Sequence, residues 1–448
     1  MLTLKALDRD WEETMKRLLM ASLLAGCSML VGVAAQAKTQ IEFWHAMGGV
    51  LNDRVDELAK QFNDGQDQYT IVPVNKGSYE ELINAMIAAY RAKRAPTIVQ
   101  TNERAFLTML NSGAVIPVTD LMDKEGYTID WSTVITPVAA YYSDKGKLQA
   151  LPFNSSTPIL WYNQEHFKAA GFDKPADTWQ ELTQQLHTIH DKGVSQCAMS
   201  LPGDYEWSFL ENYSAVNDYP YGTKRNGIDG LDTEFVFNKS LGTQVERMHD
   251  LISSGVMEIA GQGVQPVQLF TSGTCSTIIA STASHAAVEA SAKFPWSATF
   301  LPHEKDRTPH NSVIGGGALW TMKGHSEDEY KGTAAFFNFL AKPETQVWWS
   351  KNTGYVPVTT TAYEALKKEG YFEQHPTRAI AIEQLMRKPN SDNSMGFRFG
   401  NSNQANVLIM EEIMGAALGQ KPAQEALDAA VVRGNEVLRR FEKLNAGK

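Results

Sequence analysis

The chain has 448 residues, of which 43% are hydrophobic and 21% charged, and its formal net charge is −10. This length exceeds what one compact core usually serves, so two lobes or domains are expected. The acidic balance and the lack of an arginine-rich stripe argue against a nucleic-acid-binding protein. An anionic ligand would have to be held by local donors, because the field of the whole chain repels it.

Residues 1–37 are predicted to be an export signal. Lys16-Arg17 precedes an apolar run over 18–34, and Ala35-Gln36-Ala37 fits a signal peptidase site. The signal is expected to start at Met15, because the residues before it are polar and charged. A membrane anchor is the alternative, since the apolar run reaches the bottom of the spanning range.

A second alternative is a lipid anchor. Leu24-Ala25-Gly26-Cys27 fits a lipobox, which would make Cys27 a lipidated N-terminus. Apolar sequence continues past Cys27, where a lipoprotein normally turns polar, so a soluble periplasmic protein is favoured.

Strand-like and helical segments alternate from residue 40 onward. In the first part of the chain, strands are expected at 40–44, 69–74 and 97–101, with helices over 51–62 and from Ser78. Glu81 completes a capping box with Ser78. Further along, strands are expected at 159–162, 275–280, 299–302 and 313–322. Helices are expected over 178–190 and 238–253 and from Ser326, Lys342 and about Pro422.

This alternation predicts an α/β protein of two lobes, each a mainly parallel sheet flanked by helices. Connections between the lobes are expected near 152, 303–312 and 356–360. The predicted lobe 1 is 38–152 plus 303–358, and lobe 2 is 153–302 plus 359–448. Because open α/β sheets bind ligands at the carboxyl ends of their strands, a ligand is expected between the lobes, held by hinge closure.

Two cysteines remain after the signal, Cys197 and Cys275. In an oxidising compartment such a pair is a candidate disulfide. Two separate buried thiols are the alternative, because sequence alone does not establish their distance.

The most informative segment is Leu151-Pro-Phe-Asn-Ser-Ser-Thr-Pro-Ile-Leu-Trp-Tyr-Asn163. Pro152 and Pro158 favour extended backbone before them and exclude a helix. Hydroxyl and amide side chains, including Ser156, therefore stand at the start of a short buried strand. This arrangement is typical of a connection that crosses between lobes and lines a cleft.

Other candidate ligand-binding residues lie at expected strand ends and helix starts. They are Tyr79, Glu103, Ser281, the triplet Gly315-Gly316-Gly317, and Tyr355. Hydroxyls, backbone amides, one carboxylate and aromatic faces suit a small polyhydroxylated ligand, with serines and helix N-termini holding an anion. Taken singly, each also has an ordinary role as a helix cap, a packing residue or a turn.

Motifs of enzymes are absent from the sequence. No Gly-x-Ser-x-Gly elbow, P-loop or His-Glu-x-x-His helix occurs. His187 and His190 have metal-like spacing, but their helix is rich in Gln and Thr, so a solvated face is favoured over a zinc site. Neither catalysis nor a metal nor a cofactor is expected.

The sequence resembles the solute-binding proteins of ABC importers, most closely the group that binds sn-glycerol 3-phosphate. The likeness runs from Ile41-Glu-Phe-Trp-His45 to Arg433–Lys443. Shared words are Pro152–Pro158, Leu210-Glu-Asn212, Ile314-Gly-Gly316, Leu340-Ala-Lys-Pro-Glu344 and Thr353-Gly-Tyr355. The resemblance implies ligand contacts at Tyr79, Glu103, Ser156, Ser281, Gly316 and Tyr355. It also aligns Trp207 with one of two tryptophans that flank the ligand in the family.

Two positions depart from the family pattern. The phosphate-binding arginine of the family falls on Asn406, and the second tryptophan falls near Asp204. Asparagine lacks the charge and the bidentate fork of arginine, so affinity for an anion is expected to fall roughly tenfold to a hundredfold. Arg398 aligns with a second arginine that the family already has.

The resemblance implies a periplasmic binding protein for glycerol 3-phosphate or a glycerophosphodiester. A neutral sugar or polyol on the same scaffold is the alternative, because of Asn406 and Asp204. A periplasmic glycerophosphodiester hydrolase is the least favoured alternative. The implied partners are the membrane permease subunits of an ABC importer, and the binding protein itself is expected to be a monomer that does not bind nucleic acid.

Overall fold

The computed structural model describes residues 38–446 except 262 and 390. The predicted signal, with Met15 and Cys27, lies outside the described residues. Within them, no helix combines the length and the apolar character needed to cross a membrane. The fold below is that of the unit Thr39–Lys448.

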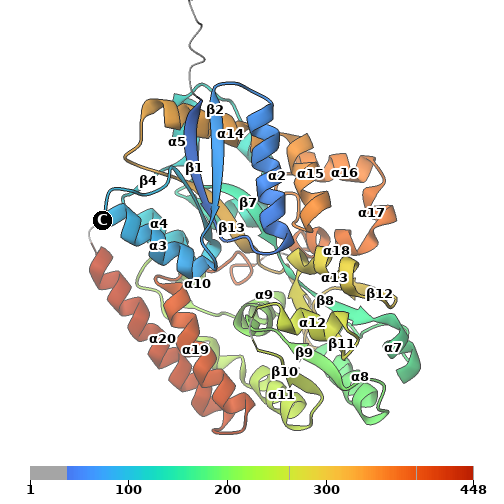
Figure 1. Ribbon diagram of the computed structural model, residues 1–448. Helices are drawn as coiled ribbons and strands as arrows, with labels where there is room; N and C mark the ends of the chain where they lie inside the picture. The colour runs from blue at the N-terminus through green and yellow to red at the C-terminus, as the bar shows by residue number, and fades with distance from the viewer. Residues whose placement is uncertain (1–37, 262, 390, 447–448) are drawn as a thin grey trace, which may run out of the picture. The chain divides into compact units, whose positions relative to one another are not determined.

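The first sheet has the strand order β2-β1-β3-β13-β4, and β7 also pairs with β13. Its strands are β1 (Thr39–His45), β2 (Tyr69–Asn75), β3 (Ile98–Asn102), β4 (Val115–Ile116), β7 (Leu151–Ser156) and β13 (Gly315–Met322). The outer helix α2 (Val50–Asp64) packs on β2 and buries Val55, Leu58, Ala59 and Phe62, which recur at helical spacing. Helix α14 (Glu327–Ala341) packs on β1 (Figure 1).

The predicted helix starts at Ser78 and Ser326 are confirmed. Each serine accepts a hydrogen bond from the backbone N–H three residues on, in α3 (Tyr79–Arg91) and in α14. The side chains of Glu81 and Glu329 accept from the serine backbone in return. Both capping boxes thus satisfy amides that the first helical turn leaves free.

The second sheet has the order β10-β9-β11-β8-β12. Its strands are β8 (Pro158–Asn163), β9 (Cys197–Leu201), β10 (Met257–Ile259), β11 (Cys275–Ser281) and β12 (Trp296–Thr299). Cys197 and Cys275 are register partners on β9 and β11, and a disulfide joins them. The expected disulfide is therefore confirmed.

Helices pack on the second sheet and on one another. They include α8 (Trp179–Asp191), α11 (Gly242–Ser253) and the pair α19 (Ser402–Ala417) and α20 (Ala423–Asn445). Helices α19 and α20 pack against each other and are the red pair in Figure 1. The remaining helices after α14 are α15 (Pro343–Thr353), α16 (Thr360–Lys368), α17 (Tyr371–Gln374) and α18 (Pro376–Leu385).

The α/β class is confirmed, but both sheets are mixed instead of mainly parallel. The parallel pairs are β1 with β2 and β3, and β9 with β10 and β11. Strand β8 follows β7 of the first sheet directly, and β13 follows β12 of the second. Each therefore enters its sheet from the opposite direction and pairs antiparallel with its neighbours.

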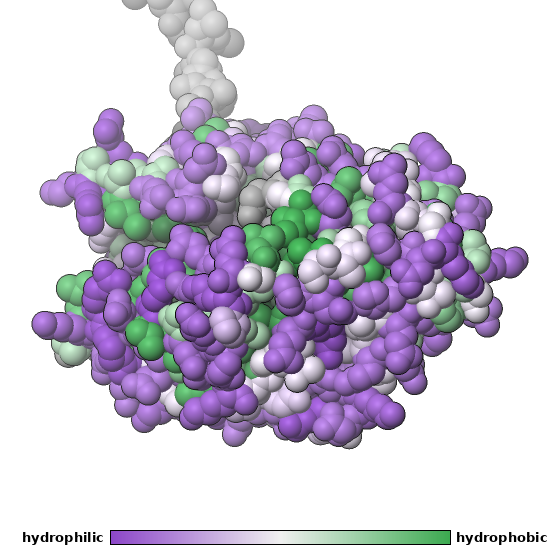
Figure 2. All heavy atoms as spheres, turned by 90° about the horizontal axis from the view of Figure 1, so that it is seen from below, coloured by the Kyte–Doolittle hydropathy of each residue, from purple (hydrophilic) through white to green (hydrophobic). Residues whose placement is uncertain are grey.

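Each sheet has its own buried apolar core. Ile41, Phe43 and Trp320 belong to the first, and Phe209 and Leu182 to the second. Figure 2 shows a face covered mainly by hydrophilic residues, with hydrophobic ones gathered near its middle. A third, smaller cluster with Trp161 and Phe270 lies against the second sheet. The apolar residues are thus divided among separate cores, as the length of the chain requires.

The segments that link the two sheets lie side by side. Thr157 stands between β7 and β8, and its hydroxyl donates to Ser312 Oγ at 2.7 Å and to the carbonyl of Val313 at 3.1 Å. The backbone N–H of Val356 donates to the carbonyl of Ser155 at 2.9 Å. Three distant parts of the chain therefore meet at one place between the sheets.

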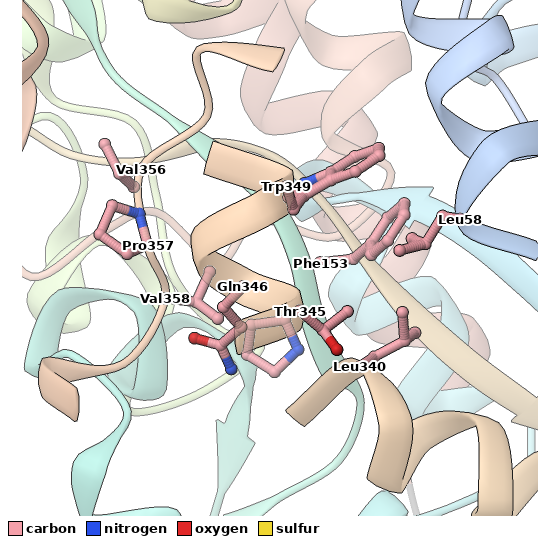
Figure 3. Close-up of a pocket in the computed structure, with 10 residues that line it drawn as sticks. Leu58, Phe153, Leu340, Thr345, Gln346, Trp349, Val356, Pro357 and Val358 are labelled. Atoms are coloured by element: carbon pink, nitrogen blue, oxygen red, sulfur yellow. The ribbon is translucent and has the colours of Figure 1, made fainter. Parts of the chain in front are cut away.

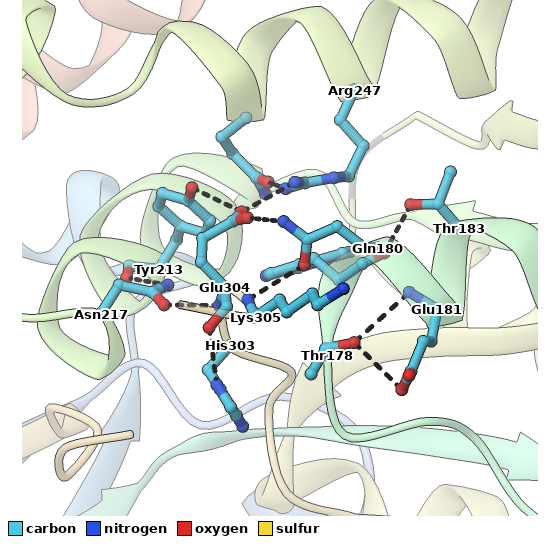
Figure 4. Close-up of polar contacts among 12 residues, drawn as sticks. Thr178, Gln180, Glu181, Thr183, Tyr213, Asn217, Arg247, His303, Glu304 and Lys305 are labelled. Atoms are coloured by element: carbon cyan, nitrogen blue, oxygen red, sulfur yellow. Dashed lines mark hydrogen bonds and ion pairs between the residues drawn. The ribbon is translucent and has the colours of Figure 1, made fainter. Parts of the chain in front are cut away.

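The segment that follows β12 is tied to the second half by Glu304 (Figure 4). This carboxylate is buried and accepts from Arg247 Nη2 and Tyr213 Oη, each at 2.7 Å. Its backbone N–H donates to Asn217 Oδ1 at 2.7 Å, and Gln180 donates to its second oxygen. The network satisfies the buried charge and fixes the chain before it crosses to β13.

Candidate ligand-binding cavity

A cavity of about 280 Å³ lies between the two sheets. Residues from both halves line it: Tyr79, Asn102, Glu103, Arg104, Asn154, Ser156, Asp204, Trp207, Ser281, Gly315, Gly316 and Tyr355. Of the eight residues predicted for the site, all except Asn406 are in this lining. The structure thus brings together side chains that lie almost 280 positions apart in the chain.

Strand ends explain this convergence. Glu103 follows β3, Ser156 ends β7 and Ser281 ends β11, while Gly315 begins the antiparallel strand β13. Carboxyl ends of parallel strands and the start of an antiparallel one meet at the same edge. Each sheet therefore presents polar groups to the space between the two.

Gly315 and Gly316 each allow another group to approach the backbone closely. Gly316 has φ +106°, and a Cβ on it would lie 1.8 Å from the carbonyl oxygen of Asn154. A Cβ on Gly315 would lie 2.5 Å from the ring of Trp207. Only glycine combines this backbone conformation with these contacts, so these glycines set both the strand pairing and the position of the indole.

Tyr79 belongs to a series of hydrogen-bonded polar side chains that begins on the first sheet. Its hydroxyl accepts from Asn154 Nδ2 at 3.0 Å, and Asn154 Oδ1 accepts from Gln100 Nε2 at 2.8 Å. These bonds hold the Tyr79 hydroxyl at the cavity wall, where it retains a proton to donate to a ligand oxygen.

Tyr355 is held by an aromatic stack. Its ring stacks on Trp349 with centroids 6.0 Å apart, and Trp349 stacks on Phe153 at 4.7 Å. Burial raises the pKa of Tyr355 to about 12, although its hydrogen bond with Asn154 acts in the opposite direction. Its hydroxyl is therefore protonated at neutral pH and is able to donate.

A separate apolar pocket lies behind this stack (Figure 3). Leu58, Leu340 and Val358 line it together with Phe153 and Trp349. Convergent charged groups are missing from its lining. We therefore assign the ligand site to the polar cavity and a packing role to this pocket.

Arg104 is a site residue that the sequence analysis missed. Its Nη2 lies 2.5 Å from Glu206 and 3.4 Å from Glu211, and its Nε lies 3.8 Å from Glu103. Burial lowers the pKa of Arg104, but the carboxylates outweigh burial and hold it above its ordinary value. Arg104 follows Glu103 at the end of β3, which is the one local signal that could have marked it.

The acidic partners of Arg104 come from the other half of the molecule. Glu206 and Glu211 are the ends of η3 (Glu206–Glu211), a π-helical turn that follows β9. Burial raises the pKa of both carboxyls, and their mutual repulsion adds to this for Glu206, while Arg104 acts against it. The ion pairs thus join the first sheet to the second beside the cavity.

Glu103 is buried at the cavity wall. Burial raises its pKa to about 7, although Arg104 and the backbone amides of Glu103 and Gly316 act in the opposite direction. The carboxyl therefore titrates near neutral pH and is able to donate or accept a hydrogen bond.

Asn406, expected at the position of the family's phosphate-binding arginine, and Arg398, which aligns with a second arginine of the family, both lie outside the cavity lining. Asn406 is buried on α19, and its Nδ2 donates to Glu206 at 3.0 Å, so it stands behind the wall. Arg398 donates to the carbonyls of Ala140 and Tyr141, and its guanidinium lies 4.7 Å from the ring centroid of Phe106. Neither side chain is in the lining of the cavity.

Asp204 and Trp207 form the wall on the second half. The backbone N–H of Trp207 donates to the Asp204 carbonyl at 3.0 Å, and the indole N–H donates to the carbonyl of Ile314 at 3.4 Å. Asp204 is exposed and lines the cavity, but the surrounding protein desolvates its carboxyl and raises its pKa, while Arg104 acts in the opposite direction. A ligand would therefore meet an indole face beside a carboxyl group.

Two mixed sheets with a polar cavity between them define an α/β ligand-binding protein. Residues 57–379 match the model of the bacterial extracellular solute-binding protein family. The chain is 40% identical over 421 residues to the sn-glycerol-3-phosphate-binding periplasmic protein UgpB of Pectobacterium atrosepticum. The alignment covers 92% of this chain and 94% of that protein. The chain therefore belongs to the bacterial extracellular solute-binding protein family.

Solved structures share the fold. UgpB from Mycobacterium tuberculosis, in complex with glycerophosphocholine, matches with a TM-score of 0.78 at 21% identity, over 90% of this chain and 99% of that one. The GacH receptor of Streptomyces glaucescens, solved unliganded and with acarbose, matches with a TM-score of 0.75 at 17% identity, over 90% of this chain and 99% of that chain. Both share the two-lobe α/β fold of this chain.

Proposed function

We propose that this protein is the exported substrate-binding component of an ABC importer and takes glycerol 3-phosphate or a glycerophosphodiester. The observation that carries the proposal is the convergence of Tyr79, Glu103, Ser156, Trp207 and Tyr355 on one cavity between the sheets. Relatives 40% identical over almost the whole chain are glycerol-3-phosphate-binding proteins by name.

The roles of the lining residues follow from their chemistry. Glu103 accepts from hydroxyls of a glycerol unit, while Tyr79 and Tyr355 donate to its oxygens. Arg104 is the one guanidinium in the lining and faces the phosphate oxygens. The two halves would close on this ligand, and membrane permease subunits would recognise the closed form.

A neutral sugar or polyol is the second candidate. The observation that favours it is the charge of the lining, in which Glu103 and Asp204 face a single Arg104. The acarbose-binding neighbour shows that the fold also serves a carbohydrate. Aromatic faces such as Trp207 suit a sugar ring as well.

Calorimetric titration of residues 38–448 separates these candidates. Glycerol 3-phosphate, glycerophosphocholine and maltose would be titrated in turn, and the ligand would be recovered afterwards. Micromolar or tighter binding of a glycerophosphate compound that is recovered intact supports the proposal. Binding of maltose alone supports the carbohydrate alternative, and release of glycerol 3-phosphate from the diester would indicate a hydrolase.

A further inference from the structure

Three carboxyls surround the guanidinium of Arg104 behind the cavity wall. Its Nη2 lies 2.5 Å from Glu206 and 3.4 Å from Glu211, and its Nε lies 3.8 Å from Glu103. Glu206 is 0% exposed and Glu211 is 2% exposed, so solvent does not screen their charges. Ionisation of all three carboxyls beside one guanidinium would therefore leave an excess of negative charge in the interior, which is costly.

The other ionisable groups near the two buried carboxyls supply no positive charge. Asp204 is a further acid, and the remaining groups are phenols whose pKa burial holds above the ordinary value: Tyr141, Tyr205 and Tyr221. Among the described residues, Arg104 is the one cation that forms an ion pair with Glu206 or Glu211. A bound proton is therefore the simplest way to reduce the excess charge.

Glu206 and Glu211 also contact each other. They stand at the two ends of η3, and a hydrogen bond joins their carboxyls. Two carboxylates are both acceptors, so this bond requires a proton on one of them. Burial raises the pKa of both groups, while Arg104 acts in the opposite direction. Close carboxyl pairs of this kind hold one proton between them.

The surrounding donors favour Glu211 as the member that carries the proton. Glu206 Oε2 accepts from Arg104 Nη2 and from Asn406 Nδ2, the latter at 3.0 Å. Its Oε1 accepts from Tyr221 Oη at 3.4 Å. Donors on both oxygens favour the ionised form of Glu206, whereas Glu211 accepts from Arg104 at the longer distance of 3.4 Å. Glu211 is thus free to donate to Glu206.

The backbone that carries the pair is fixed beside the cavity. Asn212 follows Glu211, and its Nδ2 donates to the carbonyl of Trp207 at 3.0 Å. Its Oδ1 accepts from the backbone N–H of Val313, on the segment that crosses to β13, at 2.9 Å. The two carboxyls are therefore held in place on the second half, where they meet Arg104 of the first.

We propose that Glu206 and Glu211 share one proton at neutral pH and act as positioning residues for Arg104. The pair then contacts the guanidinium through both carboxyls but brings only one negative charge to it. A second negative charge at this place would repel a phosphate in the cavity. The part of this inference that concerns ligand binding rests on the proposed function, whereas the shared proton does not.

Nuclear magnetic resonance tests the shared proton without a ligand. Residues 38–448 would be labelled with carbon-13 at the glutamate carboxyl carbons and measured at neutral pH. We expect the signal of a protonated carboxyl that is absent in Glu211→Gln. Glu103, with a pKa of about 7, is identified by the signal lost in Glu103→Gln. Spectra in which every other glutamate is ionised overturn the proposal.

Calorimetric titration of glycerophosphocholine at neutral pH tests the positioning role. Glu211→Gln should bind within about twofold of the wild type, because its amide donates to Glu206 as the shared proton does. Glu211→Ala removes this bond and the contact with Arg104, so roughly tenfold weaker binding is expected. Glu364→Gln, at an exposed carboxyl on α16, is the control and should bind like the wild type.

The outcomes separate the proton, the positioning role and the proposed function. Roughly tenfold tighter binding by Glu211→Gln would mean that Glu211 is ionised in the wild type, and would overturn the shared proton. Wild-type affinity in Glu211→Ala would overturn the positioning role. Binding by none of the proteins would overturn the positioning role and the proposed function together, while the resonance spectra still decide the proton. Circular dichroism checks each fold, and Glu206→Gln replaces Glu211→Gln if the latter does not fold.

Discussion

Gly316 illustrates how one residue without a side chain shapes the site. Its φ of +106° and the missing Cβ let β13 approach Asn154 closely. Because the neighbouring glycine contacts the ring of Trp207, the strand position also fixes the aromatic wall. The structural role of Gly316 and its proposed place in the ligand site therefore coincide.

Gly316→Ala is expected to destabilise the fold and weaken ligand binding. The new Cβ would meet the Asn154 carbonyl at 1.8 Å, so the strand must shift. Gly324→Ala is the matched control, because Gly324 has a similar φ of +99° but no atom within 4 Å of a built Cβ. Thermal unfolding should show a loss for Gly316→Ala larger by about 1–3 kcal/mol. Equal losses in the two variants would mean that the whole loss comes from the positive φ, and that the close contact with Asn154 contributes nothing.

Glu103 should make stability depend on pH. Its pKa of about 7 in the folded protein lies above the ordinary 4.5, so the unfolded chain loses the proton first as pH rises. The contribution of Glu103 to stability therefore falls between about pH 4.5 and pH 7 and is constant above that range, by about 3 kcal/mol in all.

Glu103→Gln removes this titration. Urea unfolding at several pH values should show that the free energy of unfolding of the glutamine variant rises relative to that of the wild type between pH 4.5 and 7. Above pH 8 the difference between the two should be constant. The charged groups that act on the pKa of Glu103, Arg104 and Glu206, remain in both proteins. A difference that does not change with pH would mean that Glu103 keeps an ordinary pKa.

At the scale of elements, the segment between β12 and β13 is fixed by the buried pair Arg247–Glu304. Glu304→Ala leaves Arg247 without its carboxylate and removes partners of Tyr213 and Gln180. The expected loss in the free energy of unfolding is about 3–5 kcal/mol. Asp64→Asn, which breaks the exposed pair with Lys60, is the control and should cost less than about 1 kcal/mol. Similar losses for both variants would contradict a special role for Glu304.

The elements that could be predicted are those with a local signature. The capping boxes at Ser78 and Ser326 and the alternation of strands and helices located most of the first sheet. Helix α19 was missed, because an apolar residue such as Val407 also stands on its exposed face, so the sequence shows no clear helical period of apolar residues. Strand β12 spans Trp296–Thr299 instead of 299–302, since the turn that ends it has no strong signal.

The candidate site could be predicted where its residues follow strand ends. It could not be predicted where it depends on side-chain contacts between the two halves. Tyr79, Glu103 and Ser156 each carry a local sign and also match a family motif. The contact of Arg104 with Glu206 joins residues from different sheets, which no local pattern reveals. The same holds for Asn406, whose place behind Glu206 depends on how α19 packs.

At the scale of the whole unit, we propose that the two sheets with their helices move as two lobes. The crossings at Thr157, Val313 and Val356 lie side by side and are hydrogen-bonded to neighbouring crossing segments, as expected of a hinge. Small-angle scattering should then show a smaller radius of gyration when the ligand is added. A radius that is the same with and without a saturating ligand would mean that binding does not close the cavity.

The central claim is that the cavity between the sheets holds the ligand. The most direct measurement is calorimetric titration of glycerophosphocholine into residues 38–448, comparing the wild type with Trp207→Ala. The account predicts micromolar or tighter binding by the wild type and at least a tenfold loss in the variant, because the indole forms one wall. Equal affinity of the two proteins, with the variant folded, would place the ligand elsewhere and contradict the account.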